Sequence, residues 1–336
     1  MPSIKSRVVS TYLRHTRKKA FSSAAEMNRW IERARTLEDH RPPAAVAKRV
    51  DISRRDIAGS PVYEVRPRTA DADDRRILYL HGGAYVFEIT PFHWRLIGEM
   101  AERLQARITV PIYPIAPEHR FEDMFGMVAE TYRALLDETP AEDIVFMGDS
   151  AGGNMAVVLT MMAAGEGLPL PARHVLISPG LDMTLENPDV AQAARLDPWL
   201  DIEGGLEAIR HYAPHLDRAD WRISPIKGDL SVLPPTLILA GEFDMLTIDT
   251  IRFAEMARTA GVEVDLVVEP GMVHVWPLID MPEARKARDR IVAWLGGDEA
   301  KPQMRDRQTP LPQGLRWPSL TDASSYLANW TNRSGA

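Results

Sequence analysis

The stretch Gly148-Asp149-Ser150-Ala151-Gly152-Gly153 decides the fold that we predict for this chain. It follows the apolar run 144–147 and precedes the small, apolar stretch 154–164, an order typical of a strand, a sharp turn and a helix. Glycines on both sides of Ser150 let the turn tighten and push the serine Oγ into an exposed, strained position. The pattern predicts a nucleophile elbow. A segment this short also arises by chance as a plain turn, so the prediction depends on partners elsewhere in the chain.

The composition is that of an ordinary soluble globular protein. The 336 residues suit one large α/β domain with an added cap. They are 45% hydrophobic and 26% charged, with a formal net charge of −7, and nothing in them points to nucleic acid. The chain has no cysteine, which excludes disulfides, thiolate metal sites and a cysteine nucleophile. Because we find neither an apolar run of about 18 residues nor an apolar signal segment, we expect a cytoplasmic protein without membrane insertion.

Short apolar strands alternate with amphipathic helices over most of the chain. This alternation predicts an α/β fold with a mostly parallel, doubly wound sheet and helices on both faces. An antiparallel opening is expected from strands at 47–52 and 60–66. Further strands are expected at 76–80, 108–113, 144–147, 174–178, 236–240 and 263–268. Helices are expected at 92–106, 121–138, 154–164, 248–260 and 282–295.

Two segments interrupt or precede this alternation and are predicted to form a helical cap. They are residues 1–45, with helices at 4–19 and 24–37, and the insertion 182–225. The core is then 46–181 together with 226–296, and 297–336 is a C-terminal tail that does not fit an α/β unit. The helix at 4–19 is amphipathic and carries six Lys or Arg before the first acid, Glu26. Such a helix could lie on an anionic membrane, but packing on its own domain is the commoner arrangement and is our prediction.

A serine nucleophile needs a histidine base, held in one tautomer by a carboxylate. In α/β-hydrolase folds the chain order is serine, acid, histidine, each presented where a strand ends. Asp244 follows the predicted strand 236–240, and His274 follows the strand 263–268. Glu242 and Asp249 are the competing acids; the first comes early in the turn, and the second falls on the next helix. We therefore predict Ser150, Asp244 and His274 as the catalytic residues.

A second glycine loop supplies the expected oxyanion site. Backbone N–H groups must point at the developing oxyanion, and glycine lets that backbone approach closely. The loop after the strand 76–80 provides Gly82, Gly83 and Ala84, and Ala151 adds the N–H that follows the nucleophile. His81 precedes this strip and is expected to brace the loop. The alternative for this segment is a plain turn.

With these residues placed, the chain resembles the hormone-sensitive-lipase-like esterases, the bacterial family IV branch of the α/β-hydrolases. The resemblance covers about residues 76–295 and is carried by His81-Gly82-Gly83, the elbow, the segment Tyr113 to His119, and the Asp244 and His274 contexts. It implies an α/β-hydrolase fold with a helical cap. Where the family usually has a third glycine, this chain has Ala84, whose methyl group narrows the approach to bulky esters. The segments 197–200 and 229–235 are also similar to monoterpene ε-lactone hydrolases.

The resulting functional prediction is a serine carboxylesterase that hydrolyses short- to medium-chain acyl esters through an acyl-enzyme intermediate. It needs no metal and no cofactor, and its partner is a small-molecule ester or lactone. The alternatives are a lactone hydrolase with the same triad and a non-catalytic small-molecule binding module on a hydrolase fold. A homodimer is a further hypothesis. Five residues are predicted to line the substrate pocket: Tyr85, Trp199, Leu200, Val275 and Trp276.

Overall fold

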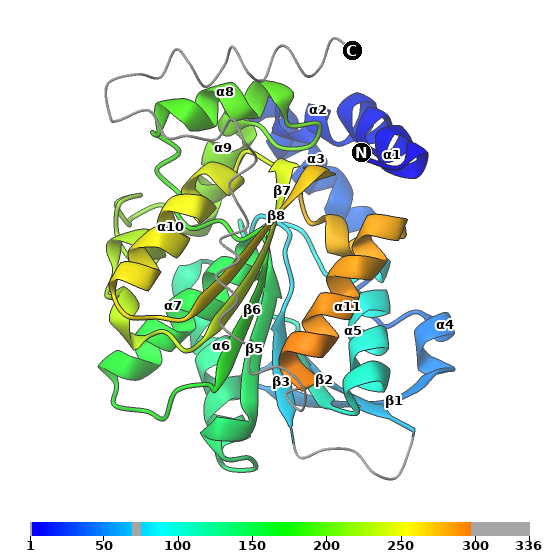
Figure 1. Cartoon of the computed structure of the whole chain (residues 1–336), viewed down its shortest axis with the longest axis vertical. Coiled ribbons are helices and arrows are strands. Elements are labelled where there is room, and N and C mark those ends of the chain that lie inside the picture. The colour runs from blue at the N-terminus through cyan, green and yellow to red at the C-terminus, as the bar shows by residue number, and fades with distance from the viewer. Residues whose placement is uncertain (1, 69–74, 297–336) are drawn as a thin grey trace, which may run out of the picture. The chain divides into compact units, whose positions relative to one another are not determined.

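A central sheet with helices on both faces organises the computed structural model, which describes residues 2–68 and 75–296 (Figure 1). The predicted tail, 297–336, lies outside the described residues. The strands are β1 Val50–Ile57, β2 Ser60–Pro67, β3 Arg76–Leu80, β4 Arg107–Pro111, β5 Ile144–Asp149, β6 Arg173–Ile177, β7 Thr236–Phe243 and β8 Val264–Val273. The helices are α1 Ile4–Thr16, α2 Lys18–Phe21, α3 Ala24–Leu37, α4 Ala44–Ala47, α5 Pro91–Leu104, α6 Phe121–Leu136, α7 Ala151–Gly165, α8 Pro188–Leu196, α9 Ile202–Tyr212, α10 Thr247–Thr259 and α11 Pro282–Gly296.

The strand order across the sheet is β1-β2-β4-β3-β5-β6-β7-β8. The pairs β1–β2 and β2–β4 are antiparallel, and each later pair is parallel, which confirms the predicted mostly parallel sheet with an antiparallel opening. β5, which leads into Ser150, lies between β3 and β6. The carboxyl ends of β3, β5, β7 and β8 therefore meet at one edge of the sheet, where α/β folds place their ligands.

Alternate residues of the central strands enter two separate hydrophobic clusters, one on each face. On β3, Leu78 and Leu80 pack with α6, α7 and α10, whereas Ile77 and Tyr79 pack with α5 and α11. The two-residue period of a strand produces this division, because successive side chains point to opposite faces. Burial on both faces explains why these strands appear in the sequence as continuous apolar runs.

Residues 4–37 and 182–225, here called the cap segments, pack on each other. The amide of Asn28 on α3 donates to Glu207 Oε1 on α9 at 2.8 Å, and His211 Nε2 lies 2.6 Å from Asn28 Oδ1. A Cβ at Gly204 would lie 2.4 Å from the Cα of Phe21, so α9 approaches α2 closely enough to require glycine. Figure 1 shows these helices gathered beyond the end of the sheet at which β7 and β8 are labelled.

Several expected strand bounds differ from those observed, and two strands differ most. Residues 44–47 form the short helix α4, because alanines after Pro43 favour a helical turn, and β1 starts only at Val50. β8 continues past 268 to Val273, although Pro270 and Gly271 suggest a turn, and its pairing with β7 passes through an irregularity between Gly241 and Phe243. Within the two described ranges, none of the helices has the length and apolar character needed to cross a bilayer.

Candidate active site

Ser150 lies at a strained turn between β5 and α7. Its φ of 52° and ψ of −117° fall where residues other than glycine are uncommon, as at a nucleophile elbow. The glycines around it are required by close packing. A Cβ at Gly152 would lie 2.0 Å from the carbonyl oxygen of Leu80, and one at Gly148 would lie 2.4 Å from that of Gly152. The elbow is therefore wedged against β3 and holds the serine at the edge of the sheet.

The structure brings Ser150, His274 and Asp244 into one hydrogen-bonded row. His274 Nε2 lies 2.9 Å from Ser150 Oγ, and His274 Nδ1 lies 2.8 Å from Asp244 Oδ2. An ionised carboxylate only accepts, so Nδ1–H donates to Asp244 and leaves Nε2 free to accept the serine proton. The second oxygen, Asp244 Oδ1, accepts from the N–H of Leu246 at 3.0 Å, which fixes the carboxylate. Because His274 and Asp244 are buried, water competes little for these bonds.

The electrostatic surroundings of His274 favour its protonated form. Burial lowers the pKa of the imidazole, whereas the charge and the hydrogen bond of the adjacent Asp244 carboxylate raise it, and the net shift is upward. Asp197 and Asp149 add smaller contributions in the same direction. A histidine with a raised pKa is a stronger base toward Ser150, which suits proton transfer during nucleophilic attack.

The loop after β3 presents backbone N–H groups next to the elbow. Gly83 has a φ of 137° and Ala84 a φ of 52°, so the loop passes through conformations that favour glycine. The N–H groups of Val86 and Phe87 both donate to the Gly83 carbonyl oxygen and close the turn. Among the residues that the structure describes, we find no acceptor for the N–H groups of Gly83, Ala84 and Ala151. These three donors are open to a ligand oxygen.

The prediction of Gly82 as an oxyanion donor is wrong. Its N–H donates to Asp149 Oδ1 at 3.1 Å and is therefore not free to bind an oxyanion. A Cβ at Gly82 would lie 2.3 Å from Asp149 Oδ2, so glycine is required here by contact with the elbow. The sequence could not indicate this role, because it depends on the direction in which the Asp149 side chain points.

Asp149 ties the elbow to two other elements. Its Oδ1 also accepts from the Tyr79 hydroxyl at 2.7 Å, and its Oδ2 lies 3.2 Å from His93 Nε2 on α5. The N–H of Thr90 donates to His93 Nδ1 at 2.9 Å, so Nε2 carries the proton that is shared with Asp149. Burial opposes ionisation of Asp149, but the contacts with His93 and Tyr79 outweigh it and lower the pKa of the carboxyl. A buried carboxylate thus fixes the serine relative to the glycine loop.

His81 braces the glycine loop, as expected from its place in the sequence. Its ring stacks on Tyr113 at 4.3 Å, and Nδ1 lies 2.7 Å from the carbonyl oxygen of Gly82. The Tyr113 hydroxyl donates to the His81 carbonyl oxygen. Burial lowers the pKa of His81 to about 4, so the ring is neutral near pH 7. His81 therefore contributes packing and hydrogen bonds rather than charge.

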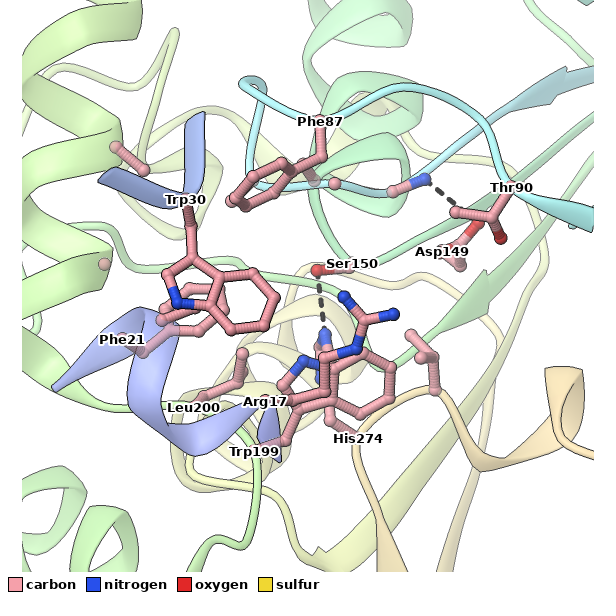
Figure 2. A pocket seen from close by; sticks show the side chains of 18 of the residues that line it. Arg17, Phe21, Trp30, Phe87, Thr90, Asp149, Ser150, Trp199, Leu200 and His274 are labelled. Atoms are coloured by element: carbon pink, nitrogen blue, oxygen red, sulfur yellow. Dashed lines mark hydrogen bonds between the residues drawn. The ribbon is translucent and has the colours of Figure 1, made fainter. Parts of the chain in front are cut away.

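A cavity of about 850 Å³ opens onto Ser150 and His274. Figure 2 looks into it and shows these two residues joined, with Phe21, Trp30, Phe87, Trp199 and Leu200 around them. Four of the predicted lining residues do line it: Tyr85, Trp199, Leu200 and Val275. Much of the wall comes from α1, α2 and α3. The sequence predicted helices in this region, but it did not indicate which of their residues line the pocket.

The prediction of Trp276 as a pocket residue is wrong. Val275 adopts a left-handed φ of 47°, which turns the chain after His274. Trp276 consequently enters the hydrophobic cluster with α5 and α11 and is buried away from the cavity. A single left-handed residue that is not glycine has no clear sequence signature, so this reversal was not predictable.

Asp197 is a buried carboxylate that the site prediction did not include. Its Oδ1 accepts from the N–H groups of Trp199 and Leu200 at 2.7 and 2.9 Å, and its Oδ2 accepts from that of Met245 at 2.9 Å. It thus fixes two pocket residues and the residue after Asp244. The Trp199 ring meets the His274 ring edge-on at 5.7 Å. Burial and the nearby Asp244 carboxylate raise the pKa of Asp197 to about 7.

A metal site is not evident near these residues. Within 2–68 and 75–296, no cluster of three or more histidine or acidic side chains has an arrangement suited to a metal ion. The groups that this arrangement offers for chemistry are a serine hydroxyl, an imidazole base held by a carboxylate, and three open backbone N–H groups.

A doubly wound sheet with an elbow serine bonded to a histidine defines the class of α/β-hydrolase-fold proteins. The family described as alpha/beta hydrolase fold matches residues 77–278, and the chain belongs to this family. An esterase of Acinetobacter venetianus is 33% identical over 215 residues, which are 63% of this chain and 71% of that protein. An acetyl-hydrolase of Streptomyces hygroscopicus is 32% identical over 231 residues, covering 68% and 77% of the two chains.

A solved structure extends the similarity to the whole described core. It is that of an esterase from the bacterial hormone-sensitive lipase family, with a TM-score of 0.76 and 28% identity over 88% of this chain and 98% of that one. Together with the esterase relatives, this similarity confirms the predicted resemblance to hormone-sensitive-lipase-like esterases.

Proposed function

We propose that this chain, a carboxylic ester hydrolase by its family and relatives, is a serine carboxylesterase for short- to medium-chain acyl esters. The observation that carries the proposal is the 2.9 Å approach of His274 Nε2 to Ser150 Oγ, with Asp244 behind the imidazole. The cavity of about 850 Å³ has room for an acyl chain. A relative named acetyl-hydrolase supports the short end of this range.

In the proposed reaction, Ser150 Oγ attacks the ester carbonyl carbon while His274 Nε2 takes the hydroxyl proton. The N–H groups of Gly83, Ala84 and Ala151 stabilise the negative charge on the carbonyl oxygen. Collapse of the tetrahedral intermediate breaks the ester C–O bond, and the alcohol leaves with the proton from His274. Water then loses a proton to His274 and attacks the acyl-serine. The acid departs, and the proton returns to Ser150 Oγ.

The test is a panel of p-nitrophenyl esters from acetate to palmitate, together with several ε-lactones, run on the full chain. We expect turnover to peak on short or medium chains, and Ser150→Ala to lower kcat by about 1000-fold or more. Ser53→Ala, an exposed serine on β1, is the matched control and retains activity. A fluorophosphonate probe followed by peptide mass analysis locates the reactive hydroxyl.

Each other outcome favours a different function. Normal turnover by Ser150→Ala excludes the proposed nucleophile. Faster hydrolysis of ε-lactones than of linear esters favours the lactone hydrolase, and a maximum on palmitate favours a lipase. If the chain binds esters but hydrolyses none of them, it is a binding module.

The division of the chain into core and cap, its cellular location and its oligomeric state are also proposals. The division into cap pieces 1–45 and 182–225 around the core is supported by the packing of α3 on α9. A cytoplasmic location is supported by the absence of cysteine, since an oxidising compartment would bring no disulfide. Self-association into a homodimer is a hypothesis that size-exclusion chromatography with light scattering tests directly.

A further inference from the structure

Helix α1 exposes an apolar stripe that nothing in the described structure covers. Ile4, Val8 and Tyr12 are 82%, 63% and 63% exposed, and they follow one another at four-residue spacing on one side of the helix. The opposite side packs inward through Ser6 and Leu13, which are buried. Figure 1 shows α1 at the outer edge of the molecule, beside α2 and α3. The stripe therefore faces away from the core.

The same helix is fixed firmly at both ends. The N–H of Ser3 donates to Glu283 Oε1 at 2.6 Å, and Lys5 forms an ion pair with Asp280 at 2.8 Å. At the other end, Arg14 donates to the carbonyl oxygen of Leu196 at 2.9 Å. A helix that is free to rotate would turn its apolar side toward the protein core. The contacts at the two ends of α1 instead hold its apolar stripe toward solvent.

The stripe continues into the rim of the active-site cavity. Tyr12 lines the cavity and is exposed, and so are Leu37 and Phe92, with 68% and 44% of their surfaces exposed. Residues that both line a cavity and face solvent lie at its mouth. The four most exposed large apolar side chains of the described residues, Ile4, Leu37, Val8 and Tyr12, are thus all on α1 or at this mouth.

Positive charge borders the α1 part of this apolar surface, although the chain as a whole carries a net charge of −7. Residues 4–21 contain six Lys or Arg and no acid. Of these, Arg7, Arg14, Arg17 and Lys19 make no ion pair with any described residue. Arg7 directly precedes Val8 and flanks the stripe. An apolar face bordered by cations that have no carboxylate partner is the arrangement that binds an anionic lipid surface.

We propose that α1 and the adjoining rim dock the protein on an anionic lipid surface, with Ile4, Val8 and Tyr12 buried among the headgroups and acyl chains. The charge distribution selects this occupant over a second copy of the chain, since two α1 helices would bring like charges together. Docking places the cavity mouth against the lipid, so that esters dissolved in the membrane reach Ser150 without crossing water. Only this last consequence rests on the proposed esterase activity.

The test is flotation of the full chain with vesicles of phosphatidylcholine alone and of phosphatidylcholine mixed with phosphatidylglycerol. We expect binding to the anionic vesicles that weakens as salt is raised. The double variant Ile4→Asp/Val8→Asp should lower the partition coefficient by about tenfold or more, because each change removes an aliphatic side chain that the lipid would bury and adds a charge of the same sign as the lipid headgroups. Met256→Asp, which alters a 43% exposed side chain on α10, is the matched control and should bind normally.

Neither Ile4 nor Val8 lines the cavity, so hydrolysis of a soluble ester and the circular dichroism spectrum report whether the double variant is folded. If it does not fold, Arg7→Glu/Lys19→Glu tests the same surface by charge reversal and should weaken anionic binding by a similar factor. Absence of wild-type binding to anionic vesicles overturns the proposal, as does unchanged binding of these variants. A dimer that becomes a monomer in the double variant would show that the stripe joins two copies instead. Because binding is measured without turnover, none of these results bears on the esterase proposal.

Discussion

Replacing Asp149 by asparagine should uncouple the elbow from α5, which follows the glycine loop. The carboxylate accepts three hydrogen bonds, from the Tyr79 hydroxyl, the Gly82 N–H and His93 Nε2. An asparagine keeps one oxygen for Tyr79 and Gly82 but turns an NH2 group toward His93. Since the Thr90 N–H occupies His93 Nδ1, the proton stays on Nε2 and two donors face each other.

The variant loses the charge-assisted hydrogen bond between His93 and Asp149, and it leaves two buried N–H donors without an acceptor. Such changes cost about 2–4 kcal/mol of the free energy of unfolding. The α5 end of the glycine loop also loses its attachment to the elbow through His93, and partial misplacement of the oxyanion donors should lower kcat by about 10- to 100-fold. KM for a small ester should change less, because the cavity wall is formed mainly by other segments.

Urea unfolding followed by tryptophan fluorescence measures the stability loss, and hydrolysis of p-nitrophenyl butyrate measures kcat. Tyr79→Phe is the control: it removes a single donor and retains the Asp149–His93 pair, so it should cost about 1 kcal/mol and leave kcat within a few fold. An Asp149→Asn variant within about 0.5 kcal/mol of the parent and equally active would refute this account of the buried carboxylate.

Two further predictions concern the triad and the elbow. Activity requires neutral His274, and Asp244 raises its pKa, so kcat/KM should fall with decreasing pH along a limb centred above about 6.5. The pH profile of p-nitrophenyl butyrate hydrolysis measures this limb, and a midpoint below 6.5 would contradict the assignment. Gly152→Ala places a Cβ 2.0 Å from the Leu80 carbonyl oxygen and should destabilise the protein by about 3 kcal/mol or more, whereas Gly165→Ala, with nothing within 4 Å, should be neutral or slightly stabilising. Thermal unfolding of the two alanine variants compares them directly, and equal melting temperatures would count against the packing argument.

The sequence predicted those parts of the site whose chemistry restricts the residue type. A serine between glycines after an apolar run, and an acid and a histidine after later strands, need only the chain order and the parallel sheet to meet at one edge. The structure places all three residues within hydrogen-bond distance in that order.

The remaining features depend on directions that a sequence does not encode. Gly82 and Gly83 are adjacent and chemically identical, yet one N–H donates to Asp149 and the other is open. Trp276 directly follows the pocket residue Val275, but the left-handed conformation of Val275 directs the Trp276 side chain into the core. The direction in which a side chain points changes with a single backbone angle. Pocket residues are therefore harder to predict than the residues that carry the chemistry.

The packing of the cap segments has a consequence for recombination between relatives. The groups proposed for chemistry come from the ends of core strands, while much of the cavity wall comes from two segments that lie far apart in the chain. Asn28 on one segment forms hydrogen bonds with Glu207 and His211 on the other. The backbone of Phe21 packs so closely on Gly204 that no larger residue fits there. A chimera that exchanges one segment alone breaks this matched pair. Substrate range should therefore be transferable between homologues only when both segments are exchanged together.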